Sequence, residues 1–225
     1  MEGIKYKTVF LTGASRGIGY AIAKRLKEEK YNIISPNRQE LDLASDVSLS
    51  NYFEKNKNIP VDILINNAGI NNPQWIHELE DENITRTFAV NLIAPLKLIR
   101  TYSHHMIQKQ WGRIINISSM FGIVARGKQV SYVASKHGMC GLTKALALEL
   151  GQYNILVNVV CPGFVKTDLT NRNSNEKNDI LAKDIPLKRF AKPEEIAEVV
   201  AFLISERNTY INGASIVIDG GYTCK

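Results

Sequence analysis

The chain has 225 residues, a length that suits one domain with a sizeable hydrophobic core. Its 44% hydrophobic and 22% charged residues are typical of a soluble globular protein, and no apolar run approaches the ~20 residues that a membrane-spanning helix needs. The net charge of +6 comes from scattered lysines and arginines, so we expect no nucleic-acid or membrane partner. Three cysteines without metal-ligand spacing favour a reducing cytoplasm and no metal site.

A glycine-rich turn near the start of the chain has the context of a dinucleotide-phosphate loop. An apolar run at 7–11 predicts a buried strand, which leads through T-G-A-S-R-G-I-G into an amphipathic helix at 18–30. Gly13 permits the tight turn, Gly17 lets the backbone approach a pyrophosphate, and Gly19 permits close packing of helix and strand. A purely structural turn is the alternative, but the flanking strand and helix favour cofactor binding.

The second predicted strand, residues 32–35, ends in a segment without an acidic residue. In dinucleotide-binding folds an acid at this point holds the ribose 2′-hydroxyl of NAD, whereas an arginine accommodates the 2′-phosphate of NADP. Arg38 follows the strand, and Arg16 in the glycine turn is a second candidate cation. We therefore predict NADP(H) in preference to NAD(H), with solvent-facing arginines as the alternative.

Residues 41–43 predict a short third strand, although they follow the second strand too closely for a full crossover helix. Asp42 and Leu43 fall where the adenine of a cofactor is expected, and a simple turn carboxylate is an equal alternative for Asp42. A helix at 47–57 and a strand at 61–65 follow. The sequence N-N-A-G ends that strand, and its small residues suit close approach of the backbone to a ribose.

A long helical pattern covers residues 81–110, and Pro95 predicts a kink in it. Asn91 is the polar residue in this pattern that we single out. A hydrogen bond from its side chain to a neighbouring backbone group is the structural alternative to a catalytic role.

The next strand and helix carry the residues with the clearest chemistry. An apolar strand at 113–117 delivers a serine pair, and a helix begins near Gln129 after a glycine-containing loop. Tyr132 and Lys136 lie four residues apart on this helix and so share a face. We expect the ammonium to favour the phenolate and to lower the pKa of Tyr132 from its usual value of about 10. Such a tyrosine transfers a proton to or from an oxygen that a serine hydroxyl holds. A surface pair is the alternative.

The C-terminal third predicts a buried strand at 155–160 and a last strand at 216–218. Pro162 and Gly163 follow the first of these, at the sheet edge where open α/β folds bind ligands. A proline and two glutamates mark the start of one more helix. The polar stretch 170–183 has little to bury, so we expect it to be mobile, either as a substrate lid or as a surface loop.

The motifs T-G-A-S-R-G-I-G, N-N-A-G, Y-V-A-S-K and P-G-F-V-K-T occur in this order between about Thr8 and Tyr222. In this the chain resembles the short-chain dehydrogenase/reductase family, and within it the bacterial 3-oxoacyl-[acyl-carrier-protein] reductases. The resemblance implies one NAD(P)-binding domain over 1–225, with a doubly wound (Rossmann-type) α/β fold and a mostly parallel seven-stranded sheet. It also implies a homotetramer, or a dimer, built through the long helices and the C-terminal strand.

The resemblance further implies a role for each matching residue. Tyr132 would be the general acid in reduction, and Lys136 would lower its pKa and hold the nicotinamide ribose. Ser119, preferred over Ser118 by its spacing to the tyrosine, would bind the substrate oxygen. Asn91 would fix a water in a proton relay. The cofactor contacts that the resemblance and the motifs together imply are Gly13, Ser15, Arg16, Gly17, Ile18, Gly19, Arg38, Asp42, Leu43, Asn67, Ala68, Gly69, Tyr132, Lys136, Pro162, Gly163, Val165 and Thr167.

The sequence thus predicts an oxidoreductase that reduces a carbonyl to an alcohol with NADPH, with a 3-oxoacyl thioester of fatty acid biosynthesis as the first substrate candidate. Two departures from the family pattern leave another small carbonyl compound, such as a sugar derivative, as the alternative. The segment between the second and third strands is short, and the sequence after Pro162 and Gly163 diverges. A non-catalytic nucleotide-binding sensor or assembly protein is a third hypothesis, and the complete catalytic set argues against it.

Overall fold

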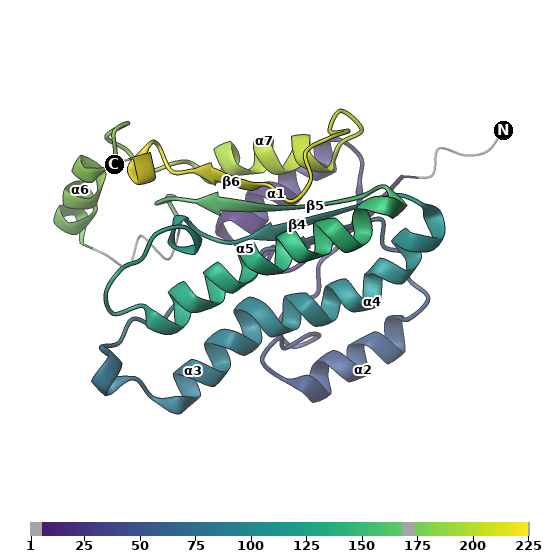
Figure 1. Cartoon of the computed structure of the whole chain (residues 1–225), viewed down its shortest axis with the longest axis horizontal. Coiled ribbons are helices and arrows are strands. Elements are labelled where there is room, and N and C mark those ends of the chain that lie inside the picture. Colours follow the sequence, from purple (N-terminus) through teal and green to yellow (C-terminus); the bar gives the residue numbers. More distant parts are fainter. Residues whose placement is uncertain (1–5, 168–173, 225) are drawn as a thin grey trace.

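The computed structural model describes residues 6–167 and 174–224, which form a parallel sheet with helices on both faces (Figure 1). The six parallel strands have the order β2-β1-β3-β4-β5-β6. The chain therefore adds β2 on one side of β1 and then crosses back to add β3 to β6 on the other side. The strands are β1 (Thr8–Leu11), β2 (Asn32–Ile34), β3 (Ile63–Asn66), β4 (Gly112–Ile117), β5 (Ile155–Pro162) and β6 (Ser215–Ile218). The helices are α1 (Gly17–Glu28), α2 (Asp46–Asn56), α3 (Asp81–Phe88), α4 (Ala94–Lys109), α5 (Val130–Leu150), α6 (Asn175–Asp184) and α7 (Pro193–Ile204).

Alternate residues of the central strands face two different helix layers. Val9 and Leu11 of β1 belong to the core that α1 and α7 cover, whereas Phe10 belongs to the core under α2, α4 and α5. Figure 1 shows these two layers on opposite sides of the sheet. Strands buried on both faces are apolar at almost every position, as the sequences T-V-F-L and I-L-I-N illustrate. The predicted doubly wound α/β class is therefore confirmed. Within the described ranges, no helix combines the length and apolar character needed to cross a membrane.

The predicted strand at 41–43 is wrong, and the described residues hold six strands instead of seven. This segment is irregular and includes a turn at 43–44, between β2 and α2. The Asp42 carboxylate accepts a hydrogen bond from the Ala44 N–H (3.0 Å), and the Asp42 N–H donates to the Ser48 hydroxyl (3.0 Å). A further parallel strand would need a crossover helix, and the chain has too few residues here to form one. The three-residue strand β2 is therefore the edge of the sheet.

The polar stretch 170–183 divides into two parts. Residues 170–173 lie outside the described residues, whereas the residues from Asn175 onward form helix α6. The expectation that this stretch has little to bury is wrong at its C-terminal end. Leu181 and Ile185 are four residues apart and pack in one apolar cluster with Phe190. A role of α6 as a substrate lid stays a prediction.

The long helical pattern is interrupted just before Pro95 by one π-helical turn, Ala89–Ile93. At the end of this turn the Ala94 N–H donates to the carbonyl of Ala89, five residues back instead of four. Proline has no N–H, so a regular α-helix would leave the carbonyl of Asn91 without its usual donor at position 95. The wider turn accommodates this, and it holds the Asn91 side chain in the interior, where it is 1% exposed.

Candidate active site

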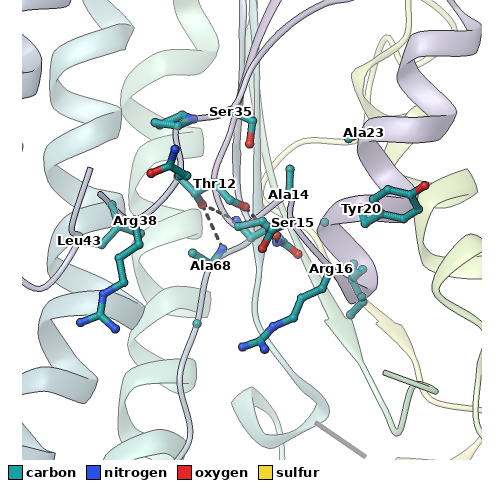
Figure 2. A pocket seen from close by; sticks show the side chains of 18 of the residues that line it. Thr12, Ala14, Ser15, Arg16, Tyr20, Ala23, Ser35, Arg38, Leu43 and Ala68 are labelled. Carbon is teal, nitrogen blue, oxygen red and sulfur yellow. Dashed lines mark hydrogen bonds between the residues drawn. The ribbon is translucent and has the colours of Figure 1, made fainter. Parts of the chain in front are cut away.

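A cleft of about 900 Å³ lies beyond the carboxyl ends of β1 and β3. Three loops line it: the glycine turn after β1, the segment between β2 and α2, and the N-N-A-G segment after β3. Figure 2 shows Ser15 and Arg16 of the first loop, Arg38 and Leu43 of the second, and Ala68 of the third around one space. All the predicted cofactor residues of these loops line the cleft: Gly13, Ser15, Arg16, Gly17, Ile18, Gly19, Arg38, Asp42, Leu43, Asn67, Ala68 and Gly69.

The glycine turn needs glycine for two different reasons. Gly13 and Gly17 adopt φ values of +71° and +55°, which side chains disfavour. Gly19 is needed for space, because an added Cβ would overlap the carbonyl oxygen of Gly13 and lie 2.5 Å from Nδ2 of Asn67. Arg16 is the N-cap of α1 and makes no side-chain capping bond, so the first turn of the helix keeps its capacity to bind an anion.

Thr12 is a structural residue of the cleft that the sequence analysis missed. Its hydroxyl accepts hydrogen bonds from the backbone N–H groups of Asn67 and Ala68, each at 3.0 Å (Figure 2). The Asn67 side chain donates back to the carbonyls of Thr12 (2.9 Å) and Gly13 (3.0 Å). These bonds hold the first and third loops in register. The signal for this role was a hydroxyl residue directly after the first buried strand.

Positive charge dominates the lining of the cleft. Arg38 and Asp42, the two charged residues predicted at the adenosine side, form an ion pair with Nη2 3.4 Å from Oδ2. Figure 2 shows Arg16 and Arg38 on opposite sides of the space. The described lining residues include one acid, Asp42, and five cations: Arg16, Lys24, Lys27, Arg38 and Arg86. Three of these cations come from helices, and only the fold brings them to the cleft.

Ser119 and Tyr132 meet where β4 and α5 converge. Their side chains share a hydrogen bond, and the Ser119 hydroxyl also accepts from the Phe121 N–H at 3.1 Å. The neighbouring Ser118 points elsewhere, because its hydroxyl donates to the carbonyl of Lys136 at 3.0 Å. The structure thus places Ser119, and not Ser118, beside the phenol.

Lys136 is buried next to this pair and is 4% exposed. Its Nζ donates to the carbonyl of Ile117 (2.9 Å) and lies 5.6 Å from the centre of the Tyr132 ring. A Cβ added to Gly69 would lie 3.4 Å from Nζ, so the ammonium adjoins a glycine that lines the cleft. Tyr132 and Lys136 are not themselves among the lining residues, and they extend the site beyond that end of the cleft.

Burial controls the protonation of both groups and corrects one expectation from the sequence. Burial raises the pKa of Tyr132, and the hydrogen bond from Ser119 opposes this only in part. The predicted lowering of this pKa by the ammonium is therefore wrong for the protein alone. Burial also lowers the pKa of Lys136 to about 8. The sequence showed the spacing of the two residues but not the desolvation that both experience.

Asn91 ties the loop after β3 to helix α5. Its Oδ1 accepts from the Ile70 N–H and its Nδ2 donates to the Ile70 carbonyl, both at 2.9 Å. Nδ2 also donates to the hydroxyl of Ser135 at 3.1 Å. A Cβ on Gly69 would lie 3.4 Å from Oδ1 of Asn91 as well as from Lys136. The backbone bonds correspond to the structural alternative, and the predicted role of Asn91 in fixing a water stays a prediction.

The segment after β5 reaches the cleft through Thr167. This residue lines the cleft, and its Cγ2 would lie 3.1 Å from a Cβ added to Gly17. Val165 pairs in a single parallel bridge with the segment that precedes α7. Four cofactor residues were predicted in this segment, and of these only Thr167 lines the cleft beside the glycine turn. The other three are not among the lining residues: Pro162, Gly163 and Val165.

Comparisons with known proteins agree with this arrangement of motifs. A family model described as Enoyl-(Acyl carrier protein) reductase matches residues 38–223. The chain is 37% identical over 233 residues to the 3-oxoacyl-[acyl-carrier-protein] reductase FabG of Rickettsia prowazekii, with 96% of each protein covered.

Solved structures are similar over nearly the whole chain. One is a 4-hydroxyisoleucine dehydrogenase complexed with NADH, with a TM-score of 0.91 and 32% identity, covering 97% of this chain and 99% of that one. Another is a candidate NAD(P)-dependent gluconate 5-dehydrogenase from Beutenbergia cavernae with NADP bound at low occupancy. It has a TM-score of 0.89 and 29% identity, and the match covers 99% of this chain and 98% of that one. Both cofactor forms occur among these structural neighbours.

Proposed function

The chain belongs to the short-chain dehydrogenase/reductase family of NAD(P)-dependent oxidoreductases, and on this premise we propose that it reduces a carbonyl to an alcohol with NADPH, Tyr132 donating the proton. The observation that carries this proposal is the hydrogen-bonded pair of Ser119 and Tyr132 with the buried ammonium of Lys136 beside it. This group stands at one end of a cleft whose glycine turn fits a dinucleotide phosphate.

The proposed roles follow from the protonation of these side chains. The cofactor supplies the hydride when it is bound. The Ser119 hydroxyl donates to the substrate oxygen and positions it, and Tyr132 protonates that oxygen as negative charge develops there. Because burial raises the pKa of Tyr132, the phenol keeps its proton until the substrate oxygen takes it. Lys136, whose pKa is lowered to about 8, is suited to return a proton to the phenolate near neutral pH.

Replacing the phenol hydroxyl tests the proton-transfer step. We expect Tyr132→Phe to lower kcat by about 100-fold or more, the usual contribution of a positioned general acid. NADPH binding, measured by fluorescence, should be retained, because the substitution removes one oxygen and leaves the ring in place. Full turnover by Tyr132→Phe would overturn the proposed role of this residue.

The charges of the cleft support NADPH as the preferred coenzyme. A 2′-phosphate adds negative charge to the adenosine end, where Arg38 lies, and the wider lining is strongly cationic. Arg38 is already paired with Asp42, so binding of the 2′-phosphate requires Arg38 to contact both anions or to leave the carboxylate. NADH has a 2′-hydroxyl in place of the 2′-phosphate, so it brings no negative charge to Arg38 at this position.

For the substrate, we favour a 3-oxoacyl thioester. The support is the similarity over 96% of the chain to relatives named 3-oxoacyl-[acyl-carrier-protein] reductase. The corresponding pathway role would be the reductive step of fatty acid biosynthesis, with an acyl-carrier-linked substrate as the partner.

A small hydroxylated carbonyl compound, such as a sugar derivative, is the second candidate. A structural neighbour is described as a candidate gluconate 5-dehydrogenase. The segment between β2 and α2 is short, and this shortness is one of the two departures from the family pattern that left a sugar derivative as an alternative substrate.

A panel assay separates the two classes. Loss of NADPH absorbance would be followed with acetoacetyl-thioester, with keto-sugars and with simple ketones, and each would be repeated with NADH. Rapid oxidation of NADPH by the thioester supports the first candidate. Turnover confined to the keto-sugars supports the second. Binding of NADPH without turnover on any substrate would favour a sensor or assembly protein and contradict the proposed activity.

A homotetramer, or a dimer, in the cytoplasm completes the proposal. Apolar side chains are exposed on the long helices that family members use for assembly: Leu96 of α4 is 42% exposed and Leu148 of α5 is 86% exposed. Sedimentation of the whole protein tests this part, since a monomer at micromolar concentration would contradict it.

A further inference from the structure

Two cysteines that the proposed reaction does not use face each other behind the active site. Cys140 lies in helix α5 and Cys161 lies in strand β5, and their Sγ atoms are 3.9 Å apart. Both thiols are free. Cys161 is fully buried, and Cys140 keeps 7% of its surface exposed.

The surroundings of this pair are tightly packed and connect it to the active-site residues. Cys140 Sγ lies 3.8 Å from the hydroxyl of Ser118, which in turn donates to the Lys136 carbonyl. A Cβ added to Gly122 would lie 2.6 Å from the Ser118 hydroxyl oxygen and 3.0 Å from Cys140 Sγ. There is therefore little free space into which the sulfur atoms could move independently.

We propose that Cys140 and Cys161 are a redox-active pair, which hydroperoxides convert into a disulfide that links α5 to β5. The sulfur atoms are 3.9 Å apart, close to van der Waals contact, so the bond forms if they approach each other by less than about 2 Å. A disulfide needs an S–S distance of about 2.05 Å.

The chemistry runs in two steps. Cys140 is the first nucleophile, because it is the more accessible thiol and because the hydrogen bond from Cys161 lowers its pKa and favours the thiolate. The thiolate attacks the peroxide, forms a sulfenic acid and releases hydroxide. The sulfur of Cys161 then attacks the sulfenic acid sulfur as its proton passes to the departing hydroxide, so that the disulfide forms and water is released. In total, two thiols are oxidised and one hydrogen peroxide is reduced to two waters.

The bond would alter the active site through the two elements that it joins. Cys140 is one helical turn beyond Lys136 on α5, and Cys161 immediately precedes the segment that begins with Pro162 and Gly163. Because the site is packed, the approach of the sulfur atoms has to be accommodated by movement of α5 relative to β5. Displacements of about 1 Å at a catalytic group typically cost about 100-fold in rate, so we expect a loss of that order. This consequence for activity rests on the proposed function, whereas formation of the disulfide does not.

The test uses the full chain with Cys224→Ser, which removes the exposed third thiol and prevents cross-linking between molecules. The reduced protein is treated with hydrogen peroxide, alkylated and digested with trypsin without reduction. We expect a cross-linked product that joins peptide 137–144 to peptide 145–166, a loss of about 100-fold in NADPH oxidation, and recovery of both after dithiothreitol. Cys140→Ser, in the same background, should lack the cross-link and keep its initial rate in peroxide, whereas Cys161→Ser should lack the cross-link and stop at oxidised Cys140.

Two results would overturn the proposal. One is that both thiols stay reduced at peroxide concentrations that fully oxidise Cys224 in the unsubstituted protein. The other is oxidation of Cys140 to sulfinic acid with no cross-linked peptide. If the cross-link forms and no substrate of the panel is turned over, the proposed function fails while the redox pair stands, so the two failures are distinguishable.

Discussion

Replacing Gly19 with alanine should deform the cofactor loop, because the structure leaves no room for one additional carbon there. The added Cβ would overlap the carbonyl oxygen of Gly13 and lie 2.8 Å from its carbonyl carbon. It would also lie 2.5 Å from Nδ2 of Asn67, which donates to the carbonyls of Thr12 and Gly13. The methyl group therefore acts on backbone atoms and on the hydrogen bonds that hold two loops together.

The magnitude follows from the cost of overpacking. Insertion of one carbon into a packed site costs about 1–3 kcal/mol. If binding of the cofactor restores the original loop, this whole cost falls on affinity, and the Kd for NADPH rises by about fivefold to 150-fold. We would measure this by NADPH fluorescence and measure the free energy of unfolding by urea denaturation.

Gly127→Ala is the matched control, because a Cβ added there meets no atom within 4 Å and the backbone does not have positive φ. It should leave both quantities unchanged within about 0.5 kcal/mol. An NADPH affinity of Gly19→Ala equal to that of the Gly127→Ala control would refute the argument from close packing.

Three further substitutions test the charges and hydroxyls of the site. Lys136→Met should abolish turnover yet stabilise the fold at pH 7 by up to about 3 kcal/mol. The pKa of Lys136 is about 8 in the folded protein and 10.5 in the unfolded chain, so the buried ammonium destabilises the folded state at pH 7. In urea denaturation this advantage should shrink as the pH rises from 8 toward 10.5, and an advantage independent of pH would contradict the pKa. Ser119→Ala should lower kcat by about 100-fold, whereas Ser118→Ala should mainly cost about 1 kcal/mol of stability. Steady-state kinetics would measure the first effect and urea denaturation the second. The reverse pattern would assign the substrate-binding role to Ser118 and the structural role to Ser119. Arg38→Ala should weaken NADPH by about tenfold and leave NADH nearly unchanged, and equal effects in a binding titration would remove Arg38 from the 2′-phosphate site.

The parts of the fold that were predictable are those in which local sequence imposes the structure. The glycine turn and the strand before it were predictable because the spacing of Gly13, Gly17 and Gly19 has few other uses between a strand and a helix. The relation of Tyr132 to Lys136 followed from helical geometry alone. In each case the signal lies within about twenty residues of chain.

The features that escaped prediction depend on the three-dimensional surroundings. The strand expected at 41–43 failed because the chain is too short there for a crossover helix, and because the side chains of Asp42 and Ser48 accept hydrogen bonds from backbone N–H groups that a strand would use for sheet pairing. The pKa of Tyr132 was misjudged because the desolvation of a side chain depends on how the whole fold covers it. Thr12 was missed because its partners are separated from it by 55 and 56 residues along the chain.

The π-helical turn at Ala89–Ile93 joins α3 and α4 into one continuous helix that packs against two different partners. An α-helix advances by about 100° per residue, so one additional residue in a turn shifts the phase of everything beyond it by about that angle. Upstream of the turn, α3 packs against α5, and downstream α4 packs against strands β3 and β4. Deletion of one residue within the turn would restore the α-helical phase, with one hydrogen bond missing at Pro95, and would rotate one of these two faces away from its partner. Asn91 lies in the turn between these two helices, so its position depends both on the packing of α3 against α5 and on the packing of α4 against the sheet.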